Sequence, residues 1–330
     1  MNRIVRELYD PAATDELHAR VGLKFPDGSD STVGIFEGDE LIACGSIKGD
    51  VLVGFAVSPK SQGEGLLARL CTELINRGVE SGLFTFYVFT KPETAAHFEE
   101  SGFKAIVSAP PHVTMLEWGE NSVEKFLKSL RNLAKDGPGQ AAAIVMNANP
   151  FTLGHRHLAL TAARESEKLY VMVVEEDKSF FPFADRLKMV RAGLADLKNV
   201  TVIPSGKYVI SDLTFPTYFL KESDVSQARC DLDLRLFGEL IAPALKVNVR
   251  YVGSEPYCRI TNQYNSAMAK ILPEYAVTVK EIKRIENGLE PIGASRVREL
   301  LKAGLLEKTK SLVPRSTYDF LEKWSGREVN

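Results

Sequence analysis

The sequence predicts two domains of different classes: an α+β domain, followed by an α/β domain with a doubly wound parallel sheet. Three observations carry this prediction. The first part of the chain has apolar runs separated by short turns, which is typical of antiparallel hairpins. The second part alternates apolar strands with amphipathic helical segments, which is typical of a parallel sheet. A firm helix stop, Gly137-Pro138-Gly139, lies between the two parts.

Length and composition agree with this organisation. A chain of 330 residues can bury two sizeable cores. With 45% hydrophobic residues and a net charge of −2, it has no general attraction to nucleic acid or to an anionic membrane. No stretch is long and apolar enough to span a bilayer, and the N-terminus lacks the apolar core of a signal peptide. We therefore expect a cytoplasmic protein without a nucleic-acid or membrane partner.

The cysteines and histidines give no metal-ligand pattern. His155 and His157 are two residues apart, so on a helix they point in different directions. The cysteines lack C-x-x-C spacing, and we interpret them as buried free thiols of a reducing cytoplasm rather than as catalytic nucleophiles. They are Cys44, Cys71, Cys230 and Cys258. We expect no residues that bind a structural or catalytic metal.

The first domain, expected over residues 1–118, begins with hairpins and continues with helix–strand units. Turn residues at short intervals separate its apolar runs. The expected strands cover residues 33–36, 41–47, 51–57 and 84–90, and the expected helices cover 66–81 and 93–100. A glycine-containing loop, residues 58–65, leads directly into the first of these helices, where backbone amides can hold a phosphate.

This order of elements resembles the GNAT-type acyltransferase fold. That family holds the pyrophosphate of coenzyme A on a loop of the form R/Q-x-x-G-x-G/A, and this chain reads K-S-Q-G-E-G, with Lys60 at the first position. The resemblance implies that the loop binds a coenzyme A-like arm. The residues concerned are Gln62, Gly63, Glu64 and Gly65. The alternative, that the glycines only shape a turn, stays open.

One departure from the GNAT pattern concerns the chemistry. Phe98, in the stretch F-E-E-S-G-F, stands where the family often has a tyrosine that protonates the leaving thiolate. Phenylalanine has no hydroxyl, so this proton donor is missing. We therefore expect the domain to bind an arm without transferring acyl groups itself.

The second domain, expected over residues 141–330, follows a helical linker at residues 119–140. The linker has apolar residues on one side, including Val123 and Leu130. Strands are expected at residues 142–146, 169–174, 200–203, 247–252 and 277–282, with helical stripes between them. Because ligands bind doubly wound sheets beyond the strand C-termini, polar residues that follow several strands should converge on one edge.

The stretch N-A-N-P-F-T-L-G-H-R-H-L, residues 147–158, follows the first of these strands directly. Thr152, Gly154 and His155 open a helix there, so backbone amides and the positive helix end face whatever lies above the turn. Glycine would let a phosphate approach the backbone, and His155 could donate to a phosphate oxygen. The arrangement suits a triphosphate that is attacked at its α-phosphorus.

A second segment, I-G-A-S-R-V-R at residues 292–298, strengthens this interpretation. We expect Ser295 to be a helix N-cap, and Arg298 lies on the same helix face, three residues on. A hydroxyl and a guanidinium at a helix start form a second anion-binding group.

With these two segments the chain resembles the nucleotidyltransferase superfamily, which has a Rossmann-like sheet. Its members carry a T/H-x-G-H signature after the first strand and an I-S-S-T-x-V-R signature on a late helix. Gly293 and Ala294 replace two serines of the second signature here. The resemblance implies that Lys178 is a phosphate-binding lysine and that Asp185-Arg186 opens the helix after it.

The predicted ATP site rests on the residues themselves and on the resemblance to the superfamily. The catalytic residues are His155, Lys178, Ser295 and Arg298, and the further ATP-binding residues are Asn147, Asn149, Thr152, Gly154, Gly253 and Glu255. Tyr257 and Arg259 are candidates for the adenine or acyl pocket. The structural alternatives stay open: a helix-capping role for His155, a surface ion pair of Arg298 with Glu299 or Glu290, turn hydrogen bonds for Asn147 and Asn149, and a solvated surface position for Lys178. We interpret the weakly patterned residues 205–233 as a loop over this site.

The combination of both resemblances is specific to one family, the citrate lyase ligases. The chain resembles that family over nearly its whole length. The matching stretches include M-N-A-N-P-F-T-L-G-H, E-D-K-S-F-F, L-T-F-P-T-Y-F-L-K, L-D-L-R-L-F, I-A-P-A-L, Q-Y-N, S-R-V-R and L-V-P. The resemblance implies an enzyme that uses ATP and acetate to acetylate a thiol on the acyl carrier subunit of citrate lyase. That thiol ends the phosphoribosyl-dephospho-coenzyme A arm of the subunit.

The implied reaction passes through acetyl-adenylate and releases AMP and pyrophosphate, with Mg²⁺ accompanying ATP and no tightly bound organic cofactor. Two alternatives stay open. One is an adenylyltransferase acting on a phosphate-bearing cofactor precursor, such as a pantetheine phosphate or nicotinamide mononucleotide. The other is a regulatory module that binds coenzyme A and nucleotide without catalysis.

Overall fold

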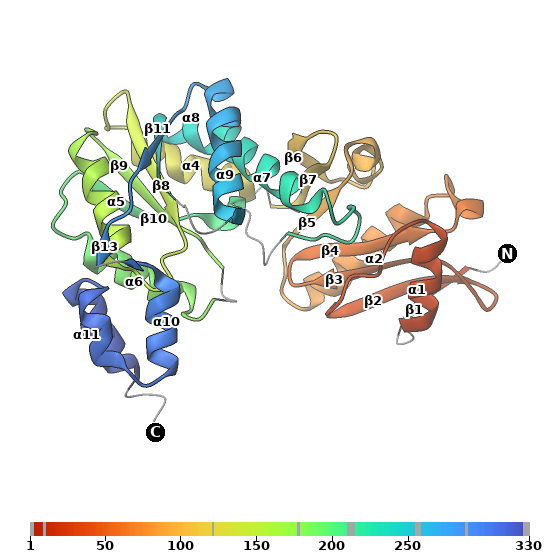
Figure 1. Cartoon of the computed structure of the whole chain (residues 1–330). Helices are drawn as coiled ribbons and strands as arrows, with labels where there is room; N and C mark the ends of the chain where they lie inside the picture. The colour runs from red at the N-terminus through yellow and green to blue at the C-terminus, as the bar shows by residue number, and fades with distance from the viewer. Residues whose placement is uncertain are drawn as a thin grey trace. The chain divides into compact units, whose positions relative to one another are not determined.

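The computed structural model describes residues 3–8, 11–120, 122–176, 179–209, 215–254, 259–287 and 290–325. The chain divides into two compact units (Figure 1). The first contains Met1–Lys125 together with Phe215–Leu232, and the second contains Phe126–Thr214 together with Asp233–Asn330. Of residues 205–233, which we expected to form a loop over the nucleotide site, the segment Phe215–Leu232 packs in the first unit.

The first unit is an α+β domain with a seven-stranded sheet in the order β1-β2-β3-β4-β5-β7-β6. Its strands are β1 (Arg3–Glu7), β2 (Ser31–Glu37), β3 (Glu40–Lys48), β4 (Val51–Val57), β5 (Thr85–Thr90), β6 (Lys104–Ala109) and β7 (Val113–Gly119). Its helices are α1 (Pro11–Arg20), α2 (Leu66–Glu80) and α3 (Ala95–Glu99), with the short 3₁₀ turns η1 (Pro59–Ser61) and η2 (Pro92–Thr94). The expected GNAT-like order is confirmed, and β1, α1, β6 and β7 add to it.

The pairing of this sheet is incomplete between two neighbouring strands. The parallel strands β4 and β5 pair only at Val51–Tyr87 and Leu52–Val88, near the start of β4. Beyond that point they no longer pair, so the sheet opens between them. Helix α2 covers the sheet with a stripe of buried residues four apart, including Leu66, Leu70 and Leu74. Residues at the N-terminus of α2 and at the opening between β4 and β5 line one pocket.

The cysteines of the first unit are structural. Cys44 and Cys71 are free and buried, and burial raises the pKa of both thiols to about 12. Thiols with such a pKa stay protonated near neutral pH, so neither is a nucleophile. Cys230 is also buried, whereas Cys258 lies outside the described residues.

The second unit has a five-stranded sheet, all parallel, in the order β10-β9-β8-β11-β12. Its strands are β8 (Ala141–Met146), β9 (Leu169–Val173), β10 (Val200–Pro204), β11 (Val247–Gly253) and β12 (Thr278–Ile282), with a small ribbon of β13 (Glu286–Asn287) and β14 (Glu290–Pro291). The chain moves outward from β8 in one direction and then restarts on its other side at β11. The expected doubly wound class is confirmed.

Helices lie between these strands and follow the last of them. They are α5 (Leu153–Arg164), α6 (Phe183–Gly193), α8 (Ala242–Leu245), α9 (Arg259–Ile271), α10 (Ala294–Lys302) and α11 (Arg315–Ser325), with the 3₁₀ turns η3 (Gly206–Tyr208), η5 (Leu272–Tyr275) and η6 (Leu306–Ser311) and the π-helical turn η4 (Phe237–Ile241). Helices α4 (Ser122–Ala134) and α7 (Val225–Leu236) each contain a boundary between the units. In the second unit, α11 packs against α6, and α10 lies nearby (Figure 1).

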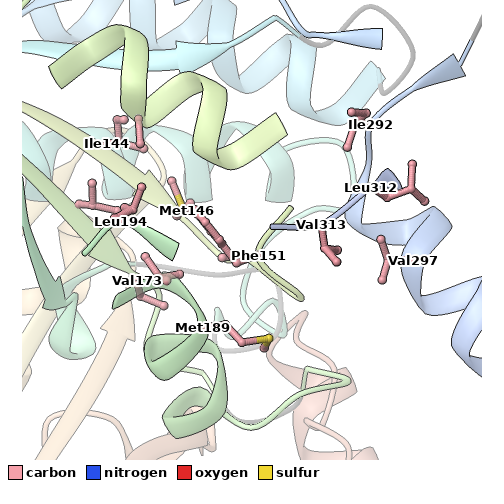
Figure 2. Packing of buried hydrophobic residues seen from close by; sticks show 14 of the residues in the cluster. Ile144, Met146, Phe151, Val173, Met189, Leu194, Ile292, Val297, Leu312 and Val313 are labelled. Carbon is pink, nitrogen blue, oxygen red and sulfur yellow. The ribbon is translucent and has the colours of Figure 1, made fainter. Parts of the chain in front are cut away.

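One core joins the sheet to the C-terminal helices. Figure 2 shows Met146 and Val173, from two strands, in the same buried cluster as Ile292 and Val297. Phe151, two residues before α5, is fully buried in this cluster and occupies the space that a side chain on Gly193 would need. The packing therefore brings the turn after β8 against the segment that leads into α10.

Within the described residues, no helix is long and apolar enough to cross a membrane. In the same part of the chain, no group of three or more His, Cys, Asp or Glu side chains is placed to hold a metal ion.

Candidate functional site

The strands of the second unit end level with one another. Met146 pairs with Val173, and Val173 pairs with Pro204. On the other side, Ala143 pairs with Arg250, and both β8 and β11 continue three residues further, to Met146 and Gly253. The loops that carry the predicted site residues therefore leave the same edge of the sheet. They do so at the switch point between β8 and β11, where such sheets bind ligands.

His155 is held in one orientation by a capping box at the start of α5. The backbone N–H of Thr152 donates to His155 Nδ1 at 3.0 Å, and the backbone N–H of His155 donates to Thr152 Oγ1 at 3.4 Å. The imidazole also stacks on the Phe151 ring, with 5.8 Å between ring centroids. The helix start was predicted, and the structural alternative for His155 is also met, because the ring itself completes the cap.

This cap fixes the protonation state of His155. A nitrogen that accepts a backbone N–H must carry its lone pair, so the proton of the neutral ring is on Nε2. Burial, together with the positive charge of Arg284, lowers the pKa of His155 to about 4. At neutral pH the side chain therefore presents an uncharged N–H donor. Such a donor suits a phosphate oxygen on which charge develops during a reaction.

Gly154 lies close to the segment before α10. A Cβ at this position would lie 2.9 Å from the carbonyl oxygen of Ile292 and 3.5 Å from Thr152 Oγ1. The glycine therefore allows α5 to approach the segment before α10. That its missing side chain also makes room for a phosphate stays a prediction.

Arg298 connects the two sequence signatures. Its Nη1 donates to the backbone carbonyl of Asn149 at 2.6 Å, and its Nη2 donates to Ser295 Oγ at 3.0 Å. Desolvation lowers the pKa of this guanidinium. Ser295 is not the N-cap that we expected. Gly293, in extended conformation, caps α10 without a side-chain hydrogen bond, and Ser295 is an exposed residue of the first helical turn.

The two asparagines support the turn with their side chains. Asn149 Oδ1 accepts the backbone N–H of Phe181 at 3.1 Å. Asn147 Oδ1 accepts Arg186 Nη1 at 2.7 Å, and its Nδ2 donates to Ser179 Oγ at 3.3 Å. The turn-stabilising alternative therefore describes both side chains.

Arg186 is a structural centre whose role sequence reasoning did not foresee. Its side chain is fully buried. The guanidinium donates to the backbone carbonyls of Asn147 and Val174 at 2.8 and 2.9 Å, and also to that of Glu176. Its Nε donates to the carbonyl of Phe181 at 3.1 Å. One side chain thus holds the ends of β8 and β9 and the following loop. In the sequence, the only sign of this role was an arginine near the start of an amphipathic helix.

Arg284 was also missed. It follows β12, and its backbone N–H donates to Ser254 Oγ at 3.2 Å. Its positive charge reaches His155, since it contributes to the lowered pKa of that ring. Arg284 and Arg298 therefore give this edge a positive potential suited to a polyphosphate. The position of Arg284, two residues beyond a predicted strand, was a signal that could have identified it.

Several predicted residues cannot be placed. Lys178, Glu255 and Tyr257 lie outside the described residues, and the side chain of Arg259, at the start of α9, is also outside them. Gly253 ends β11, and its carbonyl accepts Asn265 Nδ2 at 3.1 Å.

In the first unit, the glycine loop lines a pocket of about 590 Å³. Its wall includes Gln62, Gly63 and Gly65 at the start of α2, and Phe98 from α3. Gly63 and Gly65 have left-handed φ values of 79° and 72°, with no atom near the position of a Cβ. These glycines are therefore needed for the backbone conformation that turns the loop into the helix. Glu64 pairs instead with Arg3, at 2.7 Å.

Solved structures similar to this chain include two acetyltransferases. The ribosomal-protein-S18-alanine N-acetyltransferase of Escherichia coli is 16% identical, with a TM-score of 0.30, over 36% of this chain and 98% of that chain. The Bacillus subtilis acetyltransferase in complex with CoA is 15% identical, with a TM-score of 0.30, over 36% of this chain and 99% of that chain.

Comparison of the sequence identifies its relatives. The family model of the citrate lyase ligase C-terminal domain matches residues 141–321. Citrate (pro-3S)-lyase ligase of Klebsiella pneumoniae is 43% identical over 87% of this chain and 85% of its own length. The Escherichia coli protein of the same name is 39% identical over 89% of this chain and 86% of its own length. The chain therefore belongs to the citrate (pro-3S)-lyase ligase family, and it is an enzyme of the acid–thiol ligase kind.

Proposed function

We propose that the second unit activates acetate with ATP and that the first unit holds the thiol arm of the citrate lyase acyl carrier subunit. The observation that carries the first half is the fixed Nε2–H donor of His155, on the turn whose Asn149 carbonyl accepts a hydrogen bond from Arg298. The observation that supports the second half is the pocket beside the glycine loop. Family membership favours this function over the two alternatives, a cofactor adenylyltransferase and a regulatory module.

In the first step, an acetate oxygen attacks the α-phosphorus of ATP. The bond to the bridging oxygen breaks, and pyrophosphate leaves with the electron pair. The Nε2–H of His155 and the N-terminus of α5 stabilise the charge on the α-phosphate oxygens. Lys178, Ser295 and Arg298 bind the β- and γ-phosphates, and Asn147, Asn149, Thr152, Gly154, Gly253 and Glu255 form the rest of the nucleotide site.

Mg²⁺ fits this site as a companion of the nucleotide. The described residues contain no cluster of acidic and histidine ligands for a protein-held metal. Mg²⁺ commonly binds through substrate phosphates and water with few protein ligands, and there it would neutralise phosphate charge. The chain's own contribution is the positioning of ATP and acetate, which needs no side-chain nucleophile.

In the second step, the thiol of the phosphoribosyl-dephospho-coenzyme A arm attacks the acetyl carbonyl of acetyl-adenylate. A C–S bond forms, the C–O bond to phosphate breaks, and AMP leaves while the thiol loses its proton. Between reactions, the amides of Gln62, Gly63, Glu64 and Gly65 and the N-terminus of α2 hold the pyrophosphate of the arm. Phe98 offers no hydroxyl for acyl transfer within this unit.

The decisive test is transfer of labelled acetate. The purified protein is incubated with labelled acetate, ATP and citrate lyase whose arm carries a free thiol. We expect label on the acyl carrier subunit in a hydroxylamine-sensitive bond, with one AMP formed per acetyl group. Accumulation of a dinucleotide from a phosphate-bearing precursor would support the adenylyltransferase instead, and binding of ATP without pyrophosphate release would support the regulatory module.

A further inference from the structure

Helix α9 carries an asparagine whose side chain reaches the end of β11. Asn265 is buried, and its Nδ2 donates to the backbone carbonyl of Gly253, the last residue of β11, at 3.1 Å. Because a carbonyl oxygen can only accept, the amide is fixed with its nitrogen at Gly253. The amide oxygen, Asn265 Oδ1, is therefore left to accept a hydrogen bond from another group.

Asn265 Oδ1 is a buried acceptor without a donor. Within the residues that the structure describes, no hydrogen bond reaches this atom. Buried polar atoms in folded proteins nearly always have a partner, so an exception indicates a group that comes from outside the chain. A buried acceptor that lacks a donor is penalised, and a ligand that supplies the donor removes the penalty. Asn265 Oδ1 is therefore suited to receive an N–H or O–H group of a bound molecule.

The residue before Asn265 holds this part of α9 in place. The Tyr264 hydroxyl donates to Asp233, and it accepts a hydrogen bond from Arg250 Nη2 at 3.1 Å. Asp233 and Arg250 are both buried, and the Arg250 guanidinium lies 4.3 Å from the centroid of the Phe237 ring. Helix α9 is therefore fixed against β11 next to the acceptor. A group that reads one feature of a ligand needs such a rigid support.

Asn265 lies on the edge of the sheet that carries the predicted phosphate ligands. Ser254 follows Gly253, and its Oγ accepts the backbone N–H of Arg284 at 3.2 Å. Burial and the positive charge of Arg284 lower the pKa of His155. In a nucleotide the ribose separates the base from the phosphates, so a group that reads the base should share this edge without contacting the phosphate ligands. Asn265 meets this condition, because it contacts β11, whereas the cap of His155 belongs to the turn after β8.

We propose that Asn265 Oδ1 accepts a hydrogen bond from the 6-amino group of the ATP base and thereby makes the enzyme selective for adenine. This inference rests on the proposed function, in which ATP binds at this edge. Adenine carries an amino donor at position 6, whereas guanine and hypoxanthine carry an oxygen acceptor there. A base with that oxygen would place two acceptors against each other and leave the buried amide oxygen without its donor.

Exchange of pyrophosphate into three nucleotides tests this inference on the full-length protein. They are ATP, ITP, which has an oxygen at position 6, and purine riboside triphosphate, which has only hydrogen there. In the presence of acetate, wild type should prefer ATP over both others by about tenfold or more in kcat/KM. Since all three nucleotides are measured on the same protein, the ratio does not depend on how much of that protein is folded.

Variants at position 265 assign the preference to the amide oxygen. Asn265→Leu keeps a similar volume but removes the acceptor, and should reduce the preference for ATP to about threefold or less. Asn265→Asp retains an oxygen at this position and should keep the preference. Gln263→Leu is the matched control, because it makes the same change from amide to leucine at an exposed position of α9. It should keep the wild-type ratio.

The outcomes separate the inference from the function on which it rests. Equal use of ATP and ITP by wild type would overturn the selectivity, and so would an unchanged ratio in Asn265→Leu. If Asn265→Leu loses exchange with every nucleotide, the ratio in Asn265→Asp decides, because loss of the preference there would show that the oxygen does not select the base. Absence of exchange with every nucleotide in wild type would instead overturn the ATP-activating role of the second unit.

Discussion

The two units contain the same local motif, a strand that runs through a short loop into the N-terminus of a helix. The two loops are stabilised by different interactions. After β8, the turn is held by side chains: the capping box of Thr152 and His155, and the guanidiniums of Arg186 and Arg298. After β4, the turn depends on the left-handed backbone at Gly63 and Gly65, and α2 has no side-chain cap.

This difference matches two chemical tasks. A site that stabilises a transition state needs donors held in fixed positions and protonation states, because reorganisation during the reaction is costly. A site that only holds a pyrophosphate can rely on backbone amides, which carry no titratable group. On the proposed function, the rigid turn carries out the chemistry and the glycine turn binds the arm.

The largest expected effect is on the stability of the side-chain turn. Arg186→Met removes a buried cation and leaves four backbone carbonyls without their donor. Losing a buried, fully bonded charge should reduce the free energy of unfolding by about 3–5 kcal/mol, measured by urea denaturation. Arg191→Met, at an exposed position on the same helix, should change it by less than about 0.5 kcal/mol. Equal stability of the two variants would show that Arg186 does not hold the turn.

Arg298→Ala should mainly affect catalysis. This change removes a cation that we place at the leaving phosphates and frees the carbonyl of Asn149. Acetate-dependent exchange of pyrophosphate into ATP should fall by about ten- to a hundredfold. Arg298→Lys should restore little, because the two donors of the guanidinium contact separate acceptors. Arg296→Ala removes only a surface ion pair with Glu299 and should show the same rate of pyrophosphate exchange as wild type. Similar activity in all three variants would contradict the assigned role.

The glycine turn should respond to a change of backbone conformation. Gly65→Ala places a side chain at a φ of 72°, in a region where space is open and only the conformation is strained. The cost should be about 1–2 kcal/mol in the free energy of unfolding. Gly139→Ala, at a position with open space and no left-handed φ, should cost much less. A similar loss in both variants would show that the left-handed conformation is not what the turn requires.

The smallest effect concerns pH. The pKa of His155 in the folded protein is about 4, below its ordinary value of 6.5, so the unfolded chain binds more protons between these values. The stability that this ring contributes is present above pH 6.5 and is lost as the pH falls towards 4. Between pH 7 and pH 5, wild type should lose on the order of 1 kcal/mol more than His155→Gln, measured by urea unfolding at each pH. Parallel pH profiles would mean that the ring is not kept neutral.

Local patterns predicted much of this molecule. The strand–helix alternation, the common edge of the second sheet and the positions of His155 and Arg298 follow from apolar periodicity and from residues placed after strands. The glycine loop was found for the same reason, since left-handed turns leave glycines in the sequence.

The remaining features depend on contacts between distant residues. The bonds of Arg186 join three segments, and nothing in its neighbours along the chain shows that it is buried. The insertion of Tyr218 into the first unit pairs residues more than a hundred positions apart. The N-cap lies at Gly293 and not at the expected Ser295, because the backbone is already helical from Ala294. Such features are properties of the packed chain and have no local signature.

The central claim is that chemistry and arm binding are divided between the two turns, and two variants assayed in two reactions test it most directly. His155→Ala should lower pyrophosphate exchange by about a hundredfold or more, with His157→Ala as its control. Gly63→Asp places a carboxylate in open space at the pyrophosphate site, with neutral Gly63→Asn as its control. Gly63→Asp should slow acetylation of the carrier by about tenfold and leave pyrophosphate exchange unchanged. Unchanged exchange in His155→Ala, or equal loss of both activities in Gly63→Asp, would contradict this division.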